Sequence, residues 1–280
     1  STPTFNDRGD VVFRGFVARG PTSIGIFRSR GGQLTALVRA GDASPPSPAR
    51  TNAAPFTDFS GDPSENSAGD VAFAADVQDV GRGIFRLTSA GIRVVAMRGD
   101  QIPGSPGATF GSLAPSPSIN DAGMVAFRGT MRSPGDGSDP LNKEALFLAD
   151  GAGIHFVAKV DDASPAGPAF AQLRDPVLSD SASFAFRASL AAGSAIGTGL
   201  FVGTASGVRS LALEQDDLGG GISLSSFAGN PAFDSTGRAA FLASRSRSGR
   251  SLGQAILSGT TGAFTLVVAR GMTGPAGGVF

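Results

Sequence analysis

The sequence predicts an all-β fold, namely a five-bladed β-propeller with four antiparallel strands in each blade. A motif of the form Asn-x-x-Gly-x-(Val/Ala)-(Ala/Val)-Phe occurs five times along the 280 residues. The chain also contains 41 Gly and 18 Pro, enough for many tight turns, and its short apolar runs alternate like β-strands. Regular recurrence of one motif indicates a repeated supersecondary unit whose copies bury their apolar faces against one another.

The spacing of the motif defines the repeats. Its copies begin at Asn6, Asn66, Asn120, Ser179 and Asp234, and the fourth copy has Ala182 in place of the motif Gly. We therefore predict a single domain over residues 1–280, with repeats at about 1–55, 56–109, 110–169, 170–223 and 224–280. A chain of this length buries enough surface to form a core without disulfides or metals.

The first strand of each repeat leads to a proline three residues before the motif. These prolines are Pro3, Pro63, Pro117, Pro176 and Pro231. Proline cannot donate a hydrogen bond to a β-ladder, so it belongs where the backbone N–H faces away from a partner strand. An innermost strand that lines a channel meets this requirement.

The second strand follows the turn of the motif, in which Gly is expected to take a positive φ. Large residues such as Val11 and Phe13 alternate there with small ones, which are Val12, Ala72, Ala126, Ala185 and Ala240. Alternate residues of a strand point to opposite faces of the sheet. We therefore expect the Phe side chains of each blade to pack on the Ala row of its neighbour.

Two further strands complete each repeat. The third has a Gly-Ile-Phe pattern at 25–27, 83–85, 145–147, 199–201 and 255–257, and the fourth is a short apolar run that ends in a Gly or acidic turn. Phe280 matches the residues that enter the first strands, Phe56, Phe110 and Phe170. The chain ends are therefore expected to lie side by side and to join blade five to blade one. A β-helix or an open solenoid is the alternative.

Composition narrows the classes of function. The formal net charge is zero, which argues against a nucleic-acid partner, and no apolar run is long enough to span a membrane. Cys, Trp and Tyr are absent and His occurs once, so we expect no cofactor and no metal site. The chain begins at Ser1 rather than Met, as it would after removal of a signal peptide or after trimming.

The repeats resemble a group of bacterial tandem-repeat proteins named for their Asn-x-x-Gly-x-x-Ala-Phe motif. Residues 66–73 and 120–127 match the full motif, and residues 99–104 match its Gly-Asp-x-x-Pro-Gly surroundings. The resemblance covers the whole chain. It implies an exported protein, periplasmic, extracellular or on the cell surface, and it implies no particular activity. On this sequence, the chain is expected to depart from the group in having no terminal anchor segment.

A polar residue precedes each repeat proline, and these five residues are the first candidate site. They are Thr2, Asp62, Ser116, Asp175 and Asn230. On innermost strands they would form a polar ring around the channel, where their oxygens could hold a cation or a small ligand. Turn capping or contact with channel water is the alternative role.

Acidic residues suggest an enzyme as the second possibility. Asp42, Asp100, Asp162 and Asp217 follow the fourth strands, and inward carboxylates at set separations are what a propeller glycosidase uses. In such a hydrolase Asp62 and Asp175 would be the channel carboxylates. Asp at repeated turn positions commonly bonds its own backbone, however, and the chain lacks the Trp and Tyr platforms of carbohydrate sites.

The densest charge lies in residues 244–250, which contain Arg245, Arg247 and Arg250. Three guanidinium groups could grip an anionic partner, although a flexible solvated loop is the simpler interpretation. Asp136 and Asp139, in the long 131–144 loop, are weak candidates for calcium because no EF-hand spacing surrounds them. His155 has no second metal-ligating neighbour in the sequence and is expected to be a packing or surface residue.

These observations favour a non-catalytic, exported binding or scaffold module. The rim that carries the loops at 129–144 and 243–253 varies most in length, so it is the expected contact surface for a protein or an anionic polymer. Two alternatives stay open: a propeller hydrolase acting on a glycan, and an accessory subunit of a larger extracytoplasmic assembly.

Overall fold

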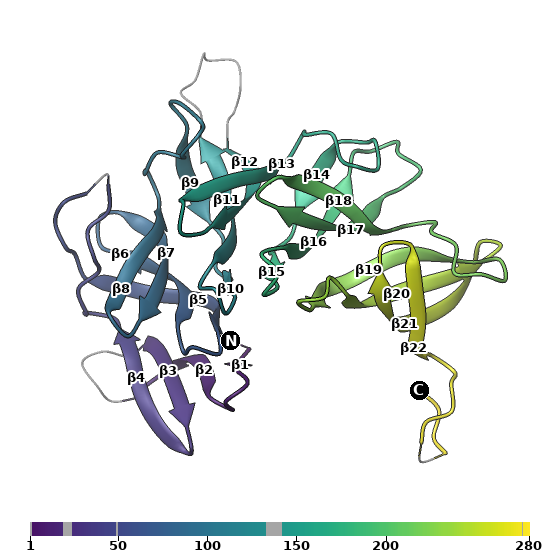
Figure 1. Cartoon of the computed structure of the whole chain (residues 1–280), viewed down its shortest axis with the longest axis horizontal. Helices are drawn as coiled ribbons and strands as arrows, with labels where there is room; N and C mark the ends of the chain where they lie inside the picture. Colours follow the sequence, from purple (N-terminus) through teal and green to yellow (C-terminus); the bar gives the residue numbers. More distant parts are fainter. Residues whose placement is uncertain (1, 19–23, 49, 133–141, 276) are drawn as a thin grey trace. The chain divides into compact units, whose positions relative to one another are not determined.

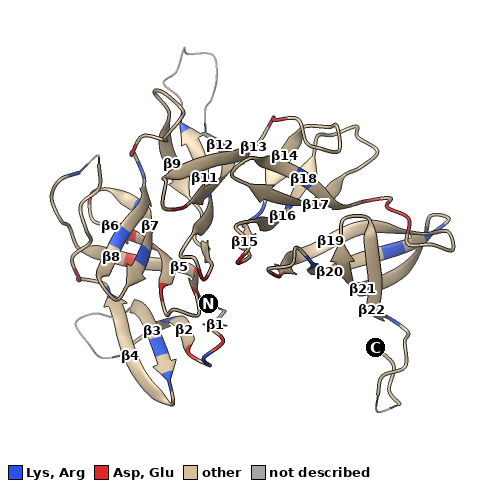
Figure 2. Ribbon diagram, in the orientation of Figure 1, with Lys and Arg blue, Asp and Glu red and all other residues tan. Residues whose placement is uncertain are grey.

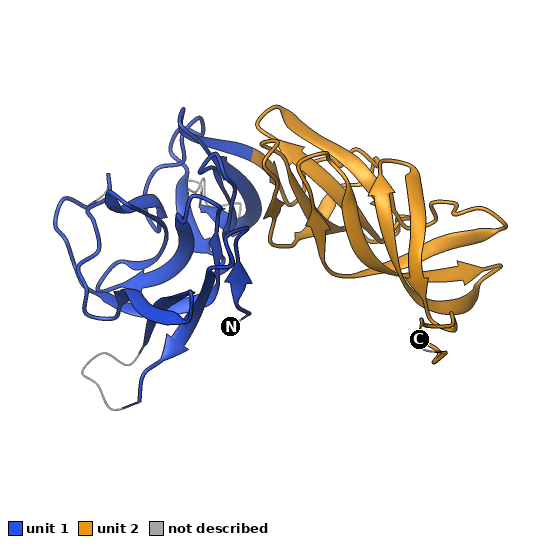
Figure 3. Ribbon diagram, turned by 60° about the horizontal axis from the view of Figure 1, so that its bottom comes forward, with its two compact units in different colours: residues 1–156 blue, residues 157–280 orange. Residues whose placement is uncertain are grey.

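The computed structural model describes residues 2–18, 24–48, 50–132, 142–275 and 277–280. The described residues contain 22 β-strands and no helix (Figure 1). The chain divides into two compact units, residues 1–156 and residues 157–280, which Figure 3 shows in separate colours. The all-β prediction is confirmed.

The strands form five antiparallel sheets, which we number I to V in chain order. Sheet I holds β1 (Thr4–Phe5), β2 (Val11–Phe16), β3 (Ile24–Arg30) and β4 (Gln33–Arg39). Sheet II holds β5 (Phe56–Glu65), β6 (Val71–Val77), β7 (Gly81–Thr88) and β8 (Gly91–Met97). Sheet III holds β9 (Thr109–Leu113), β10 (Ser118–Ile119), β11 (Val125–Arg132), β12 (Asn142–Ala149) and β13 (Ile154–Lys159).

Sheet IV holds β14 (Phe170–Leu173), β15 (Val177–Leu178), β16 (Phe184–Leu190), β17 (Thr198–Thr204) and β18 (Gly207–Leu213). Sheet V holds β19 (Ile222–Phe233), β20 (Ala239–Arg247), β21 (Arg250–Thr260) and β22 (Ala263–Ala269). In every sheet the strands pair in chain order, and in sheets III and IV two short segments share the place of the first strand. The division between the two units falls within β13.

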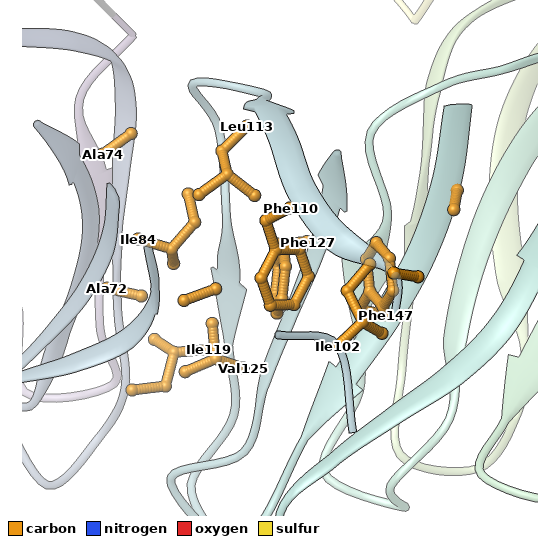
Figure 4. Packing of buried hydrophobic residues seen from close by; sticks show 13 residues of the cluster. Ala72, Ala74, Ile84, Ile102, Phe110, Leu113, Ile119, Val125, Phe127 and Phe147 are labelled. Atoms are coloured by element: carbon orange, nitrogen blue, oxygen red, sulfur yellow. The ribbon is translucent and has the colours of Figure 1, made fainter. Parts of the chain in front are cut away.

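Within unit 1 the sheets pack large face on small face. Phe73 and Phe85 of sheet II belong to one core cluster with Val12, Ile26 and Val38 of sheet I. The other face of sheet II, with Ala72, Ala74, Ile84 and Ala96, packs against Phe110, Phe127 and Phe147 of sheet III (Figure 4). Sheets I and II therefore each receive the phenylalanines of the sheet that follows them, as the alternation of large and small residues predicts.

Unit 2 repeats this arrangement. Leu200, Val202 and Ala212 of sheet IV share a cluster with Phe227 and Phe241 of sheet V. The opposite face of sheet V has no comparable cover within unit 2, because Ile256 is 41% exposed whereas its repeat equivalents Ile84, Leu146 and Leu200 are at most 1% exposed.

The Asn of the motif closes its own turn and also binds the next sheet. Asn66 Oδ1 accepts the Asp70 N–H (2.8 Å), while Asn66 Nδ2 donates to the backbone oxygen of Asn120 (2.8 Å). In the same way Asn6 Nδ2 donates to the backbone oxygen of Asn66 (3.2 Å). We call this side-chain link the Asn staple. Asp234, the fifth copy, lacks the amide donor, and its carboxylate accepts N–H groups of its own turn.

Replacing Asn66 with Asp should weaken the packing of sheet II on sheet III. Asp keeps the acceptor that closes the turn but loses the donor, and it brings a carboxylate against the Asn120 carbonyl at a site that is 4% exposed. We expect a loss of about 1–3 kcal/mol of unfolding free energy, measured by urea denaturation. The same substitution at the exposed Asn230 should change stability by less than about 0.5 kcal/mol. Equal effects at the two positions would contradict the staple.

Arginines make a second set of links between sheets. Arg14 Nη1 donates to the Phe59 carbonyl (3.2 Å), and Arg187 Nη1 donates to the Phe227 carbonyl (2.7 Å). The third arginine that follows a motif Phe, Arg128, forms an ion pair with Glu144 of its own sheet (2.5 Å). Arg14 and Arg187 thus each link their own sheet to the one that follows it.

The repeat prolines lie where the first strand leaves register. The pairing of β5 with β6 shifts between Ser60 and Ser64, and that of β19 with β20 shifts between Ala228 and Ala232. Pro63 and Pro231 fall inside these breaks, where no ladder N–H is needed. The turn prediction also holds, since the motif Gly residues have positive φ and Ala182 adopts the same conformation with φ 60°.

Candidate functional site

Three of the five predicted ring residues lie in unit 1, and they contact one another. The Thr2 N–H donates to Asp62 Oδ1 (2.7 Å), and the Asp62 N–H donates to Ser116 Oγ (3.4 Å). The Asp62 carboxylate therefore serves as an acceptor for the neighbouring sheet. Asp175 and Asn230 lie in unit 2, Asp175 half-buried and Asn230 exposed. Hydrogen bonds thus connect Thr2, Asp62 and Ser116 in unit 1, whereas Asp175 and Asn230 belong to unit 2.

The acidic residues after the fourth strands close turns. Asp42 Oδ2 accepts the Arg39 N–H (2.7 Å), and Asp162 Oδ2 accepts the Lys159 N–H (3.1 Å). Asp100 accepts a hydrogen bond from the Ser47 hydroxyl (3.0 Å). In sheet IV the equivalent acceptor is Asp216, which accepts the Leu213 N–H (2.8 Å). The prediction that Asp217 occupies this repeat position was therefore wrong by one residue. Asp217 instead caps the next turn through the Gly219 N–H (2.9 Å).

The arginine-rich segment is an ordered β-hairpin, which corrects the expectation of a flexible loop. β20 extends to Arg247 and β21 begins at Arg250, so Ser248 and Gly249 form a two-residue turn with φ of 50° and 78°. Positive φ at both residues is the geometry of a tight hairpin turn. The three arginines do not form a single anion-binding site. Arg245 is only 9% exposed, while Arg247 and Arg250 lie opposite each other near the tip of the hairpin.

The metal candidates gain no support from the structure. Asp136 and Asp139 lie outside the described residues. Elsewhere in the described chain, no three His, Asp or Glu side chains gather closely enough to hold a metal ion. His155 Nε2 lies 3.0 Å from Asp150 Oδ2, within its own sheet.

A buried charge cluster joins sheets I and II, and the sequence analysis did not predict it. Arg28 Nη2 lies 2.6 Å from Glu65 Oε1 and donates to the Gly69 carbonyl (2.5 Å). Arg30 binds Asp10 through two hydrogen bonds of 2.8 and 2.6 Å. The Glu65 side chain has no exposed surface, so it cannot reach a ligand. The signal was available only in part, as an isolated Glu directly before the second motif.

The fold shifts the pKa values of the Glu65 and Asp10 carboxyl groups in opposite directions. Burial raises the pKa of Glu65 above its ordinary value, although the nearby Arg28 partly opposes this. The hydrogen bond from Arg30 lowers the pKa of Asp10. Because the folded chain keeps the Glu65 proton to a higher pH than the unfolded chain, the contribution of Glu65 to stability falls as pH rises from the unfolded pKa through the raised one.

Glu65→Gln tests this electrostatic description. Gln does not titrate, so the unfolding free energy of the wild type minus that of the variant should fall as pH increases from about 4 to 7. Urea denaturation at several pH values measures the difference. Its slope would have the opposite sign if Arg28 lowered the Glu65 pKa below its ordinary value.

Two hollows lie on the rim that carries the connections between second and third strands. The first, about 470 Å³, lies between sheets II and III and is lined by Asp76, Gly81, Arg82, Arg98, Gly111, Ser112, Leu113, Thr130 and Arg132. It contains three guanidinium groups and one carboxylate. Arg82 Nη2 lies 3.1 Å from Asp76 Oδ2, and the buried Arg82 Nε has no hydrogen-bond partner among the described residues.

The second hollow, about 530 Å³, lies on the uncovered face of sheet V. Its lining includes Ser244, Gly253, Gln254 and Arg270, which occupy the same repeat positions as Asp76, Gly81, Arg82 and Arg98. Apolar residues, among them Leu242, Ile256 and Phe280, complete it. The two hollows are therefore one feature of the repeat, closed by the following sheet in one case and open in the other.

One family model, described as a family of unknown function, matches residues 1–154 and again residues 119–280. The chain belongs to this family, DUF7453. The two DUF7453 matches together cover the whole chain, and each spans parts of at least three sheets. The same model thus fits two overlapping series of sheets, as expected of a repeat. No curated protein matches this DUF7453 chain. In its described residues, no helix is both long and apolar enough to cross a membrane.

Proposed function

We propose that this DUF7453 chain is a non-catalytic binding or scaffold module, which contacts an anionic partner through the rim between second and third strands. The recurring hollow carries the proposal. The same two repeat positions hold Arg82 and Arg98 in sheet II but Gln254 and Arg270 in sheet V. A constant body that presents the same hollow with different side chains is the usual design of a binding scaffold.

The use of the acidic residues also supports binding over catalysis. The Asp62 carboxylate accepts a backbone N–H, and Asp42, Asp162 and Asp216 all close turns. A general acid or base needs a carboxyl group in reach of its substrate, and these groups already serve the backbone.

We propose further that the five sheets close into a propeller ring. Sheet V leaves its small-residue face uncovered within unit 2, with Ile256 41% exposed. Sheet I, which follows no other sheet, leaves Phe5, which pairs with Val11 on the large-residue face, 79% exposed. In the packing rule of both units, a small-residue face receives the large face of a following sheet, so the two uncovered faces are complementary. The likeness to the Asn-x-x-Gly-x-x-Ala-Phe proteins adds bacterial export to the proposal.

A binding and turnover assay tests the function. The whole chain is mixed with polyuronate, a sulfated polysaccharide or inorganic polyphosphate, and both retention of the polymer and release of fragments are measured. Retention without cleavage is expected, and it should fall in the Arg247→Ala/Arg250→Ala variant, which removes the exposed hairpin charges. Cleavage that disappears in Asp62→Asn would establish the hydrolase instead. Failure to retain any of the three polymers would also contradict the proposal.

A further inference from the structure

We infer that the hollow between sheets II and III binds an oxyanion group, namely a carboxylate, phosphate or sulfate carried by a small ligand. This deepens the proposed function and rests on it. Arg82, Arg98 and Arg132 line the hollow against the single carboxylate of Asp76, so its formal charge is +2. Guanidinium groups bind oxyanions through paired, charge-assisted hydrogen bonds.

Two of the three guanidinium groups are available. Among the described residues, the side chains of Arg98 and Arg132 have no hydrogen-bond or ion-pair partner. Arg82 is bound to Asp76 through one terminal nitrogen, and its Nε donor is buried and unused. An oxyanion that enters the hollow can therefore pair with the Arg98 and Arg132 guanidinium groups without displacing any hydrogen bond that these side chains make in the described chain.

The stem of Arg98 packs against Gly81, where there is no side chain to exclude it. A Cβ at Gly81, whose φ is 103°, would come within 3.0 Å of Arg98 Cδ, so the absence of a side chain lets the arginine stem pack there. Gly253 and Arg270 repeat this contact in sheet V, also at 3.0 Å. The position of the guanidinium is therefore part of the repeat design, and sheet II adds a second arginine beside it.

The opposite wall comes from sheet III and is polar. Thr130 Oγ1 accepts the Ser112 N–H (2.8 Å) and lies 3.2 Å from Ser112 Oγ. The Thr130 hydroxyl donates to the Ser112 backbone oxygen (3.5 Å), so this wall gives the hollow a polar lining while the arginines supply its free donors. A volume of about 470 Å³ is within the range of small-molecule sites and exceeds what a single inorganic ion needs. The ligand we infer is therefore an organic molecule that carries an acidic group, such as a sugar acid or a sugar phosphate.

Calorimetric titration of the whole chain tests the inference with inorganic phosphate, citrate, glucuronic acid and glucose 6-phosphate. At least one of the organic acids should bind more tightly than phosphate, and the affinity should fall with increasing salt. Arg82→Gln/Arg98→Gln should weaken binding by about tenfold or more. Arg98→Gln alone keeps the Arg82–Asp76 pair and serves if the double variant does not fold. Arg39→Gln removes an exposed arginine that lines neither hollow, so it is the control and should leave binding unchanged.

Absence of binding by all four probes, or equal losses in the Arg98 and Arg39 variants, would overturn the inference. Retention of the anionic polymers through the hairpin is measured separately. If retention persists while the small acids do not bind, the oxyanion site fails and the proposed binding function stands. If neither occurs, both fail.

Discussion

Replacing Phe85 with Ala should cost about 3–5 kcal/mol of unfolding free energy, the largest single effect expected in unit 1. The Phe85 side chain is fully buried. Its ring lies 5.0 Å from that of Phe56 in an edge-to-face arrangement and 5.5 Å from that of Phe73 in a stacked one. Truncation removes both ring contacts and leaves a cavity between sheets I and II. Urea denaturation of the purified variant measures the loss.

Phe16→Ala is the matched control for that experiment. Phe16 is 73% exposed, and among the described residues its ring has a single cation–π contact, with Arg14 at 5.9 Å. We therefore expect a loss below about 1 kcal/mol. If Phe85→Ala and Phe16→Ala lowered stability equally, the packing of the sheet II phenylalanines on sheet I would be wrong.

Replacing Gly61 with Ala should cost about 2–5 kcal/mol. Gly61 has φ 69° inside the β5 bulge, and a Cβ there would lie 2.1 Å from the backbone oxygen of Pro115 in sheet III. Positive φ costs a residue with a Cβ about 1–2 kcal/mol, and moving sheet III away costs about 1–3 kcal/mol more. The denaturation midpoint should shift to lower urea concentration accordingly.

Gly229→Ala separates the two contributions. Gly229 has φ 65° at the equivalent bulge of sheet V, and no atom of the described chain lies within 4 Å of the place its Cβ would take. It should therefore show only the conformational cost of about 1–2 kcal/mol. A Gly61→Ala variant no less stable than Gly229→Ala would contradict the close approach of sheets II and III.

The sequence was sufficient for the strands and their packing because both follow from local patterns. The alternation of Phe73 with Ala72 and Ala74 decides to which face of the sheet each side chain points. The same kind of alternation recurs in the second strand of each repeat. The prediction of a turn at each motif also needed only local information. Even Ala182, which departs from the motif, adopts the left-handed turn, because the surrounding hairpin imposes it.

The sites were less predictable because they depend on contacts between repeats. The hollow between sheets II and III combines Arg82 and Arg98 with Thr130, which lies in a different repeat, so no local motif marks it. The Glu65–Arg28 pair likewise joins two repeats. The prediction of a flexible loop at residues 244–250 was also wrong. The charge of this segment suggested a solvated loop, but Ser248 and Gly249 form the tight turn of a β-hairpin.

Distances between spin labels on the motif turns test the proposed ring most directly, and the absence of Cys allows labels to be placed in pairs. The third motif positions are Arg8, Ala68, Ala122, Ser181 and Thr236. The pairs 8/68 and 68/122 report neighbouring sheets in unit 1, and the pair 8/122 reports sheets two apart. A ring of five predicts that the pair 8/236 gives the same distance as 8/68. A distance for 8/236 equal to or longer than that for 8/122 would contradict the ring.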